Sequence, residues 1–310
     1  MKTEKILMSE AATLYYKKNM TQQEIAERMG LSRQTVSKLL SDAIEEKVVE
    51  IIIHDPQADR EALEKQICDT FGIRTCIACC VSGRNDSIHR LMAVQAAVDY
   101  ILPALLEGGR KIAVSWGRTI QEFITTLPKT STAGNTVFPL FGATDNENDY
   151  FSSNELARKL ADKLDATLKC AWFPYLTESR EEWELLKQLS YYKKMQELWN
   201  GADIAIIGIG NTEILELFGK TFGYNRIHSQ VVGDIATHFF DASGAFIDLY
   251  ENTLCASVSN LKNAKETIAI ACGKEKAEAI AAALRTSAID TLITDECTAR
   301  QILHIAKALS

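Results

Sequence analysis

Residues 21–40 read TQQEIAERMGLSRQTVSKLL, and this stretch predicts two short helices joined by a tight turn. Thr21 and Glu24 have the spacing of a capping box, in which each side chain accepts a hydrogen bond from the backbone N–H of the other residue. Gly30 can turn the chain with a positive φ at the end of the first helix, and Ser32 is placed to cap the second. This arrangement is typical of a helix-turn-helix, whose second helix enters the major groove of DNA.

Each of the two predicted helices has an apolar and a polar face. The apolar positions at helical spacing, which we expect to be buried, are Ile25, Ala26, Met29, Val36, Leu39, Leu40, Ala43 and Ile44. On the polar face, Arg and Gln suit base edges because their forked groups make paired hydrogen bonds, whereas Ser and Lys suit phosphate oxygens. An ordinary helical hairpin would not require such a face. The candidate DNA-contacting residues are Thr21, Gln22, Ser32, Arg33, Gln34, Thr35, Ser37 and Lys38.

The charge of the chain limits how it can bind DNA. Its 310 residues carry a net charge of −7, which argues against a protein that coats nucleic acid without selectivity. Residues 1–53 hold eight Lys and Arg and eight Asp and Glu, so this segment is neutral overall. A neutral helix-turn-helix makes few phosphate contacts and binds weakly by itself. We therefore expect a homo-oligomer, a dimer or tetramer, on palindromic double-stranded operator DNA.

Composition indicates a soluble globular protein, with 46% hydrophobic and 24% charged residues. Because no long apolar run is free of charge and the N-terminus lacks the apolar core of a signal peptide, we expect a cytoplasmic protein without membrane contact. Cys76 and Cys79 form a CxxC pair that invites a zinc or redox interpretation. No second pair matches it and the surrounding run is apolar, so reduced core cysteines are favoured, and no metal or cofactor is expected.

The segments around the helix-turn-helix complete a small domain. Residues 4–18 predict a helix whose buried face is marked by Ile6, Leu7, Ala11, Leu14 and Tyr15. Residues 48–53 are β-branched and predict a small wing. Residues 54–59 are polar with one Pro and indicate a boundary. We expect a DNA-binding domain over residues 1–54 and a second domain over residues 55–310, which begins with a helix at 60–70.

Strands and helices alternate beyond residue 74. Strands are predicted at 75–81, 111–115, 136–141, 167–173, 203–208, 267–271 and 290–294, and helices at 86–107, 119–127, 153–164, 181–199, 211–218, 275–285 and 296–308. Such alternation predicts an α/β fold, a Rossmann-like, mostly parallel sheet covered by helices on both faces. Ligands of such sheets lie beyond the carboxyl ends of the strands. The whole chain is therefore expected to combine a winged helix-turn-helix with a larger α/β domain.

Four loops at strand ends could hold a ligand. Residues 114–119 (VSWGRT) join a strand to a helix and could bind phosphate, since Gly117 permits close approach and the helix start offers N–H donors; an ordinary turn with a solvated Arg is equally possible. Residues 207–211 (IGIGN) hold an incomplete glycine pattern, which close packing explains as well as a ligand does. Residues 271–276 offer a Gly and two Lys. Residues 233–244 place acids beside aromatic rings, which suits sugar but also suits a capped aromatic core.

The order of these motifs resembles the SorC family of sugar-binding transcriptional regulators. The resemblance covers nearly the whole chain. Its landmarks are the helix-turn-helix, then Ser115-Trp116-Gly117-Arg118-Thr119, Pro139-Leu140 with Gly142, Gly208-Ile209-Gly210, Gly233-Asp234, Phe239-Phe240-Asp241 with Gly244, and Leu292-Ile293-Thr294-Asp295-Glu296.

The resemblance implies a large domain similar to sugar-phosphate isomerases but converted to sensing. Gly117, Arg118 and Thr119 would hold phosphate, while Asp241 and Lys276 would contact the sugar. The chain departs from the family pattern where Cys272 replaces a Gly, and it has Phe141 near the position where some relatives carry a Schiff-base lysine. The expected effector-binding residues are Ser115, Gly117, Arg118, Thr119, Gly142, Gly208, Gly210, Asp234, Asp241 and Lys276.

The leading hypothesis is a transcriptional repressor of a carbohydrate-use operon that is controlled by a phosphorylated sugar and is not an enzyme. A sugar-phosphate isomerase or deaminase with a fused DNA-binding head is the alternative, in which Asp234 or Asp241 would be the general base. No second acid or base is evident beside them in the sequence. In a third possibility the large domain only assembles copies of the chain. Binding and turnover assays with phosphosugars distinguish the three.

Overall fold

The computed structural model describes residues 2–50, 56–80, 86–132, 134–144, 152–213 and 230–308. The chain divides into two compact units, Met1–Pro56 and Gln57–Ser310. Each has its own hydrophobic core. None of the helices among the described residues combines the length and apolar content that crossing a bilayer requires.

The first unit is a small helical bundle. Its elements are α1 (Lys2–Ala12), the π-helical turn η1 (Thr13–Lys17), α2 (Gln22–Met29) and α3 (Arg33–Glu45). Ile25 of α2 and Val36 of α3 are fully buried, and α1 packs across α3. Three expected core positions are wrong, since Ile6, Tyr15 and Ile44 are exposed.

Helical geometry explains two of these errors. At 100° per residue, Ile44 lies about 80° away from Val36 around α3 and falls at the margin of the buried stripe. Tyr15 lies in η1, whose wider π-type turn rotates side chains away from the face that α1 establishes. For Ile6, the buried stripe of α1 runs through Met8, Ala11 and Ala12 instead.

The predicted wing is not seen in the part that the structure describes. Val48 and Val49 form a bend, and the N–H of Val49 donates to the carbonyl of Ala43 at 2.9 Å, so this segment folds back on α3 instead of forming a strand. Both side chains pack at the margin of the small core. Residues 51–53 and part of the predicted boundary lie outside the described residues.

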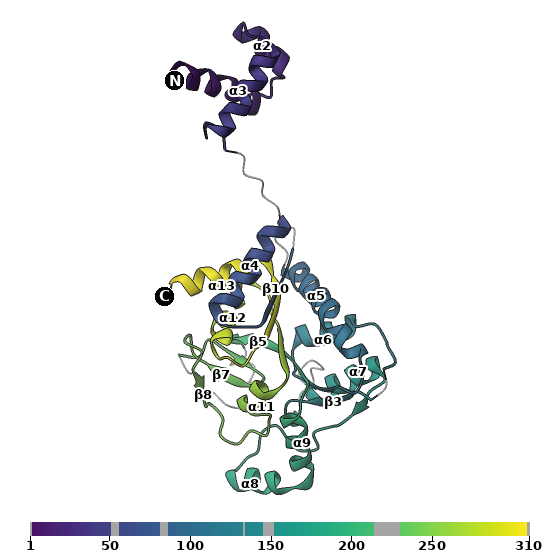
Figure 1. The fold of residues 1–310 in the computed structure, drawn as a ribbon. Helices are drawn as coiled ribbons and strands as arrows, with labels where there is room; N and C mark the ends of the chain where they lie inside the picture. The colour runs from purple at the N-terminus through teal and green to yellow at the C-terminus, as the bar shows by residue number, and fades with distance from the viewer. Residues whose placement is uncertain are drawn as a thin grey trace. The chain divides into compact units, whose positions relative to one another are not determined.

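The second unit is a parallel sheet between two layers of helices (Figure 1). Strand order across the sheet is β1-β10-β9-β5-β2-β3-β4, with every pair parallel. The strands are β1 (Thr75–Cys79), β2 (Lys111–Val114), β3 (Thr136–Pro139), β4 (Thr167–Leu168), β5 (Ile204–Asn211), β9 (Glu266–Ile270) and β10 (Thr291–Asp295). A smaller antiparallel extension leaves the end of β5 through β6 (Gly233–Ile235), β7 (His238–Phe240) and β8 (Phe246–Ile247). The predicted α/β fold is confirmed.

Helices cover both faces of this sheet because its strands are apolar on both sides. Helices α5 (Asp86–Leu106), α6 (Arg118–Thr126) and α7 (Ser153–Leu164) lie side by side on one face, and α12 (Ala277–Arg285) and α13 (Glu296–Ala308) pack together on the other (Figure 1). The remaining helices are α4 (Pro56–Phe71), α8 (Arg180–Gln188), α9 (Ser190–Asn200), α11 (Val258–Asn263) and the short η3 (Lys274–Lys276).

Three predicted elements differ from those observed. The helix expected at 181–199 is broken at Leu189, whose ψ of 144° is extended. The strand expected at 167–173 ends at Leu168, because the Asn154 side chain takes both backbone hydrogen bonds of Ala171 and replaces the ladder there. In place of a helix from residue 211, β5 continues to Asn211, and residues 214–218 lie outside the described residues.

Candidate functional site

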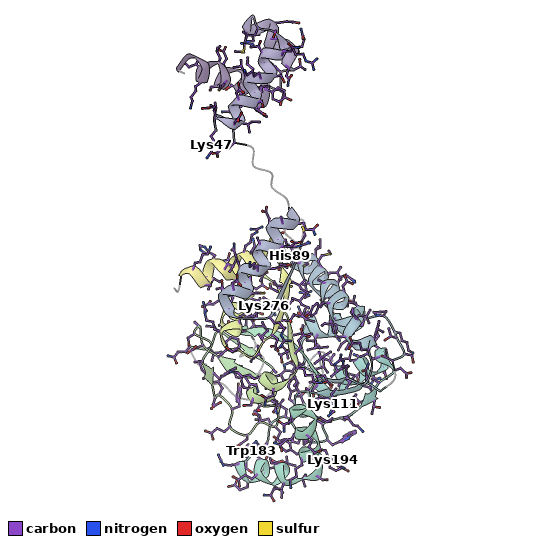
Figure 2. The ribbon with its side chains drawn as sticks, viewed as in Figure 1. Lys47, His89, Lys111, Trp183, Lys194 and Lys276 are labelled. Carbon is purple, nitrogen blue, oxygen red and sulfur yellow. The ribbon has the colours of Figure 1, made fainter. Side chains whose placement is uncertain are left out.

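The strand order creates a crevice at the carboxyl ends of β2 and β5. The chain leaves β2 toward β3 and β4 on one side, whereas it leaves β5 toward β9 and β10 on the other. Connections that depart in opposite directions leave a gap between two neighbouring strand ends, which is where open α/β sheets bind ligands. A cavity of ≈ 390 Å³ lies there. In Figure 2, Lys111 lies at the amino end of β2 and Lys276 lies beyond the carboxyl end of β9. The cavity lies at the carboxyl ends of the strands, on the Lys276 side.

Most of the expected effector residues line this cavity. Those in its wall are Ser115, Gly117, Arg118, Thr119, Gly208, Gly210, Asp234 and Lys276. They come from the ends of β2, β5 and β9 and from the antiparallel extension. Sequence segments more than 150 residues apart in the chain thus form one wall.

The β2–α6 loop forms one end of the cavity. Gly117 has φ +117°, a region that residues with a Cβ rarely adopt, and it precedes α6 without a side-chain cap on the helix. Gly117 therefore supplies no side-chain acceptor to the backbone N–H groups of the first turn of α6, which begins with Arg118 and Thr119. Helix starts of this kind attract anions, because both the N–H groups and the helix dipole favour negative charge.

Asp234 lies opposite this loop on β6, paired with Gly210 of β5. The close approach of these strands requires glycine at the neighbouring position, since a Cβ on Gly233 would lie 2.5 Å from the Gly210 carbonyl oxygen. Burial raises the pKa of Asp234 to about 6, although a hydrogen bond from the Thr237 N–H at 3.1 Å and the charge of Lys276 both act to lower it. Asp234 can therefore accept hydrogen bonds from a ligand near neutral pH.

Lys276 reaches the cavity from η3. Its ammonium donates to the carbonyl of Ile209 at 3.2 Å, and its charge acts on Asp234. The loop after β9 thus places the Lys276 ammonium near the buried Asp234 carboxyl, and a polar ligand would contact both.

Gly142 and Asp241 are not part of the cavity wall. A Cβ on Gly142 would lie 2.4 Å from the Pro174 carbonyl oxygen, so this glycine serves close backbone packing. The Asp241 carboxylate accepts hydrogen bonds from the Ser243 N–H at 2.8 Å and the Ala245 N–H at 3.0 Å, which closes the turn between β7 and β8. Hydrogen bonds led by that from the Ser243 side chain lower the pKa of Asp241.

Sequence reasoning missed several wall residues. Arg90 projects from α5 and donates to Glu122 of α6 at 2.7 Å. Nothing in the sequence distinguishes Arg90 from a solvated helix cation, because only the packing of α5 on the sheet brings it here. Ile120 and Glu213 also lie outside the four predicted loops. Within those loops, the wall residues that were not among the expected effector contacts are Trp116, Ile209, Asn211, Ala236, Cys272, Gly273 and Glu275.

The helix-turn-helix has the local geometry that its sequence predicts. The Thr21 N–H donates to the Glu24 carboxylate at 2.7 Å and the Glu24 N–H to the Thr21 hydroxyl at 3.3 Å, so the capping box is complete. Gly30 has φ +69° at the end of α2, and the Ser32 hydroxyl accepts from the Thr35 N–H at 3.1 Å. Gln22 is half-buried, and the other candidate DNA contacts are exposed: Thr21, Ser32, Arg33, Gln34, Thr35, Ser37 and Lys38.

Comparison with known proteins identifies both units. The Sugar-bind family, a sugar-binding domain, matches residues 55–304, and Sigma-70 region 4 matches residues 10–46. The chain belongs to the SorC family of sugar-binding transcriptional regulators. The resemblance noted from the sequence is thereby confirmed.

Relatives of this SorC-family chain match over nearly its whole length. It is 29% identical to the sorbitol operon regulator of Klebsiella pneumoniae, over 96% of this chain and 97% of the relative, and 26% identical to the deoxyribonucleoside regulator of Bacillus subtilis (strain 168), over 96% and 97%. The crystal structure of full-length SorC from Klebsiella pneumoniae aligns with a TM-score of 0.74 at 28% identity, covering 97% of this chain and 99% of that one. The protein is a DNA-binding transcriptional regulator with a sugar-binding domain, and it is not an enzyme.

Proposed function

We propose that this regulator is a homo-oligomeric repressor of carbohydrate-use genes and that a phosphorylated sugar in the β2–β5 cavity controls its affinity for a palindromic operator. The observation that carries the proposal is that a helix start without a side-chain cap, three cationic side chains and a buried carboxyl line one cavity. This set matches a ligand with an anion at one end and hydroxyls at the other. The sorbitol and deoxyribonucleoside regulators among its relatives agree with a sugar-derived ligand.

The phosphate would occupy the end formed by Gly117, Arg118 and Thr119. Backbone N–H groups of the first turn of α6 point at an anion there, and the Arg118 guanidinium can make two parallel hydrogen bonds to it. Arg90 adds positive charge at the same cavity. The absence of a Cβ at Gly117 leaves the backbone open to a bulky phosphate.

The sugar would lie between Asp234 and Lys276. Asp234 accepts hydrogen bonds from hydroxyls, whereas Lys276 donates to hydroxyl or carbonyl oxygens. A site built around buried polar groups rejects ligands that lack the matching hydroxyls, because those groups would be left unpaired. Ser115, Gly208 and Gly210 complete the wall and set how closely the ligand approaches β2 and β5.

Thermal shift with a panel of phosphosugars and their unphosphorylated forms tests the ligand. A ligand at about 100 times its dissociation constant should add about 2.7 kcal/mol to the free energy of unfolding. Lys276→Met should remove most of the shift, whereas Lys274→Met, which changes the exposed lysine two residues earlier in η3, should preserve it. Stronger shifts from unphosphorylated sugars would contradict the phosphate assignment.

Electrophoretic mobility shift with the promoter region upstream of the chain's own operon tests the DNA side. Arg33→Ala should cost about 1–3 kcal/mol and relax specificity at one base position. Equal losses on all sequences would assign Arg33 to phosphate instead of a base. Transcription that rises when the gene is deleted supports repression, and transcription that falls would make the protein an activator.

Control by the ligand requires that it bind one conformation more tightly than the other. A ligand that raises the melting temperature in the thermal screen should therefore change the affinity of the protein for DNA, measured by mobility shift. DNA should change the affinity of the protein for the ligand by the same factor. A ligand that binds with no effect on DNA affinity would contradict regulation and would favour a large unit that only assembles copies of the chain.

A further inference from the structure

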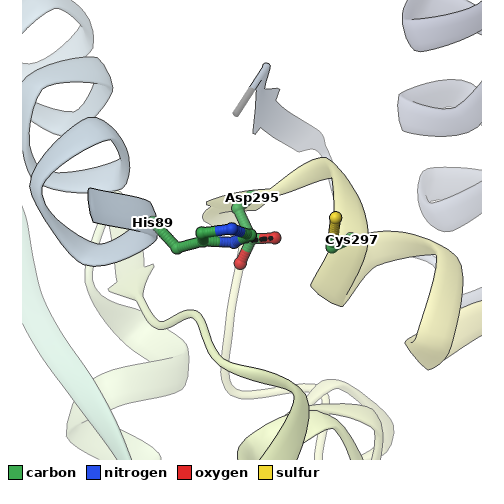
Figure 3. A group of neighbouring side chains, drawn as sticks. All are labelled: His89, Asp295 and Cys297. Carbon is green, nitrogen blue, oxygen red and sulfur yellow. Dashed lines mark hydrogen bonds and ion pairs between the residues drawn. The ribbon is translucent and has the colours of Figure 1, made fainter. Parts of the chain in front are cut away.

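A second group of reactive side chains also lies at the carboxyl ends of the strands, beside the cavity. His89 projects from α5, Asp295 ends β10, and Cys297 lies in the first turn of α13 (Figure 3). His89 Nδ1 is 3.1 Å from Asp295 Oδ1. One potential ligand atom from each of the three side chains lies within 4.8 Å of the others. Among the described residues, these three form the one group of His, Cys, Asp or Glu side chains spaced closely enough to hold a metal ion.

The charge at this point is negative and buried. Asp295 has no exposed surface. Its carboxylate accepts hydrogen bonds from the Thr298 hydroxyl, the Thr298 N–H and His89. An ionised carboxylate inside a protein is costly unless a cation or several donors compensate it.

Two further thiols lie at or just beyond the ends of the strands beside β10. Cys79 is the register partner of Asp295 on β1, and Cys272 follows β9 on the other side of β10. Cys272 is buried and Cys79 is half-buried. The end of β10 therefore places a buried carboxylate near thiol side chains, and sulfur and carboxylate oxygen are both ligands of zinc.

We propose that His89, Asp295 and Cys297 bind a divalent transition-metal ion of the zinc type. Imidazole nitrogen, carboxylate oxygen and thiolate sulfur are the ligands that zinc takes, at about 2.0–2.3 Å. One carboxylate and one thiolate balance the two positive charges of the ion. Binding releases the Cys297 thiol proton to solvent and involves no oxidation.

The spacing of the three side chains requires only a small adjustment. Ligands of a tetrahedral zinc ion lie roughly 3.4 Å apart, somewhat closer than the 4.8 Å limit within which these atoms fall. Cys297 is partly exposed to solvent, from which an ion would reach the group. A fourth position remains for water or for a neighbouring thiol.

The bound ion would fix one wall of the cavity. His89 precedes Arg90, which lines the cavity, and Thr298, the hydrogen-bond donor to Asp295, accepts from the Gly273 N–H at 2.9 Å. The ion would thus tie α5, β10 and α13 together behind the ligand site. The inference does not depend on which ligand the cavity takes.

Without a metal, the same contacts would have a purely structural role. The Asp295 carboxylate accepts the Thr298 N–H at 3.0 Å in the first turn of α13, and His89 would simply satisfy the remaining oxygen. A metal readout is required to separate the two roles, because a change in stability alone fits both.

Cobalt substitution supplies that readout. The full-length chain, with any affinity tag removed, is dialysed against chelator under a phosphine reductant and titrated with Co²⁺. We expect one equivalent to bind, with a thiolate-to-cobalt charge-transfer band and tetrahedral d–d bands, and Zn²⁺ to displace it. Cys297→Ser should abolish the charge-transfer band and weaken binding by about tenfold or more, and His89→Gln should weaken it similarly.

Cys170→Ser is the matched control, because Cys170 is also half-buried but lies in the loop after β4, away from this group. It should retain the spectrum. Circular dichroism and melting of metal-free Cys297→Ser should match the metal-free parent, so that a lost band is not a lost fold. A parent without the charge-transfer band, or a band that persists in Cys297→Ser, would overturn the proposal.

Discussion

The ionisation of Asp234 is tied to the fold. This residue is buried at the centre of the candidate site, and its pKa is raised to about 6 by that burial. The unfolded chain releases this proton near pH 4. Between these two values the folded state binds more protons than the unfolded state, so stability falls as the pH rises toward about 6.

Asp234→Asn should remove this dependence. The free energy of unfolding of the parent should fall by at most about 3 kcal/mol from about pH 4 to about pH 6.5, since one pKa unit corresponds to about 1.4 kcal/mol, and the variant should lack that component. Urea unfolding followed by tryptophan fluorescence measures it, and all four Trp residues lie in the larger unit. Asp241→Asn is the control, because its lowered pKa moves its contribution to more acidic solution. An unchanged slope in Asp234→Asn would refute the assignment.

Gly142 was expected from the sequence to contact the effector, but the structure shows that it serves close backbone packing. Gly142→Ala should destabilise the larger unit by about 1–3 kcal/mol, because the added Cβ meets the Pro174 backbone, which cannot move aside as a flexible side chain would. Urea unfolding measures the loss. Gly201→Ala is the matched control, since its Cβ would meet the mobile end of Lys111 at 3.1 Å and the Glu197 carbonyl oxygen at 3.4 Å, an ordinary contact distance. Equal stability of the two variants would contradict this account.

At the scale of single elements, the recognition helix α3 depends on its first residue. Ser32 caps α3 by accepting the Thr35 N–H. Ser32→Ala should cost about 1 kcal/mol, and Ser32→Asp should restore most of it, since Asp is an equally good cap. Hydrogen exchange over residues 33–45 in the full-length chain reports the loss locally. Ser41→Ala, an exposed change later in the same helix, should leave exchange unaltered; protection that is the same in all variants would rule out the cap as a determinant.

At the scale of the whole molecule, DNA affinity should depend on joining copies of the chain. The segment 1–53 has no net charge, so one copy makes few phosphate contacts. A palindrome of two half-sites should therefore bind far more tightly than one half-site, and the slope of log affinity against log salt should be about twice as steep. Mobility shifts at several salt concentrations measure both slopes, and analytical ultracentrifugation gives the oligomeric state. Equal affinity for half-site and palindrome would exclude the oligomer model.

The sequence by itself determined the local features of this protein, because they depend on neighbours within a few residues. The capping box at Thr21 and Glu24, the turn at Gly30 and the cap at Ser32 follow from local chemistry at close spacing. Alternation of strands and helices likewise predicted a parallel α/β sheet, whose carboxyl edge holds the candidate site.

Only the tertiary structure decided which distant residues meet. It separated Gly142 and Asp241 from the cavity, brought Arg90 into its wall, and joined His89 to Asp295 across 206 positions of chain. Strand order and the packing of helices on the sheet fix such contacts, and no local pattern encodes them. The sequence could identify the strand ends that bear polar residues, but the side chains that surround one ligand became known only when those ends were placed side by side.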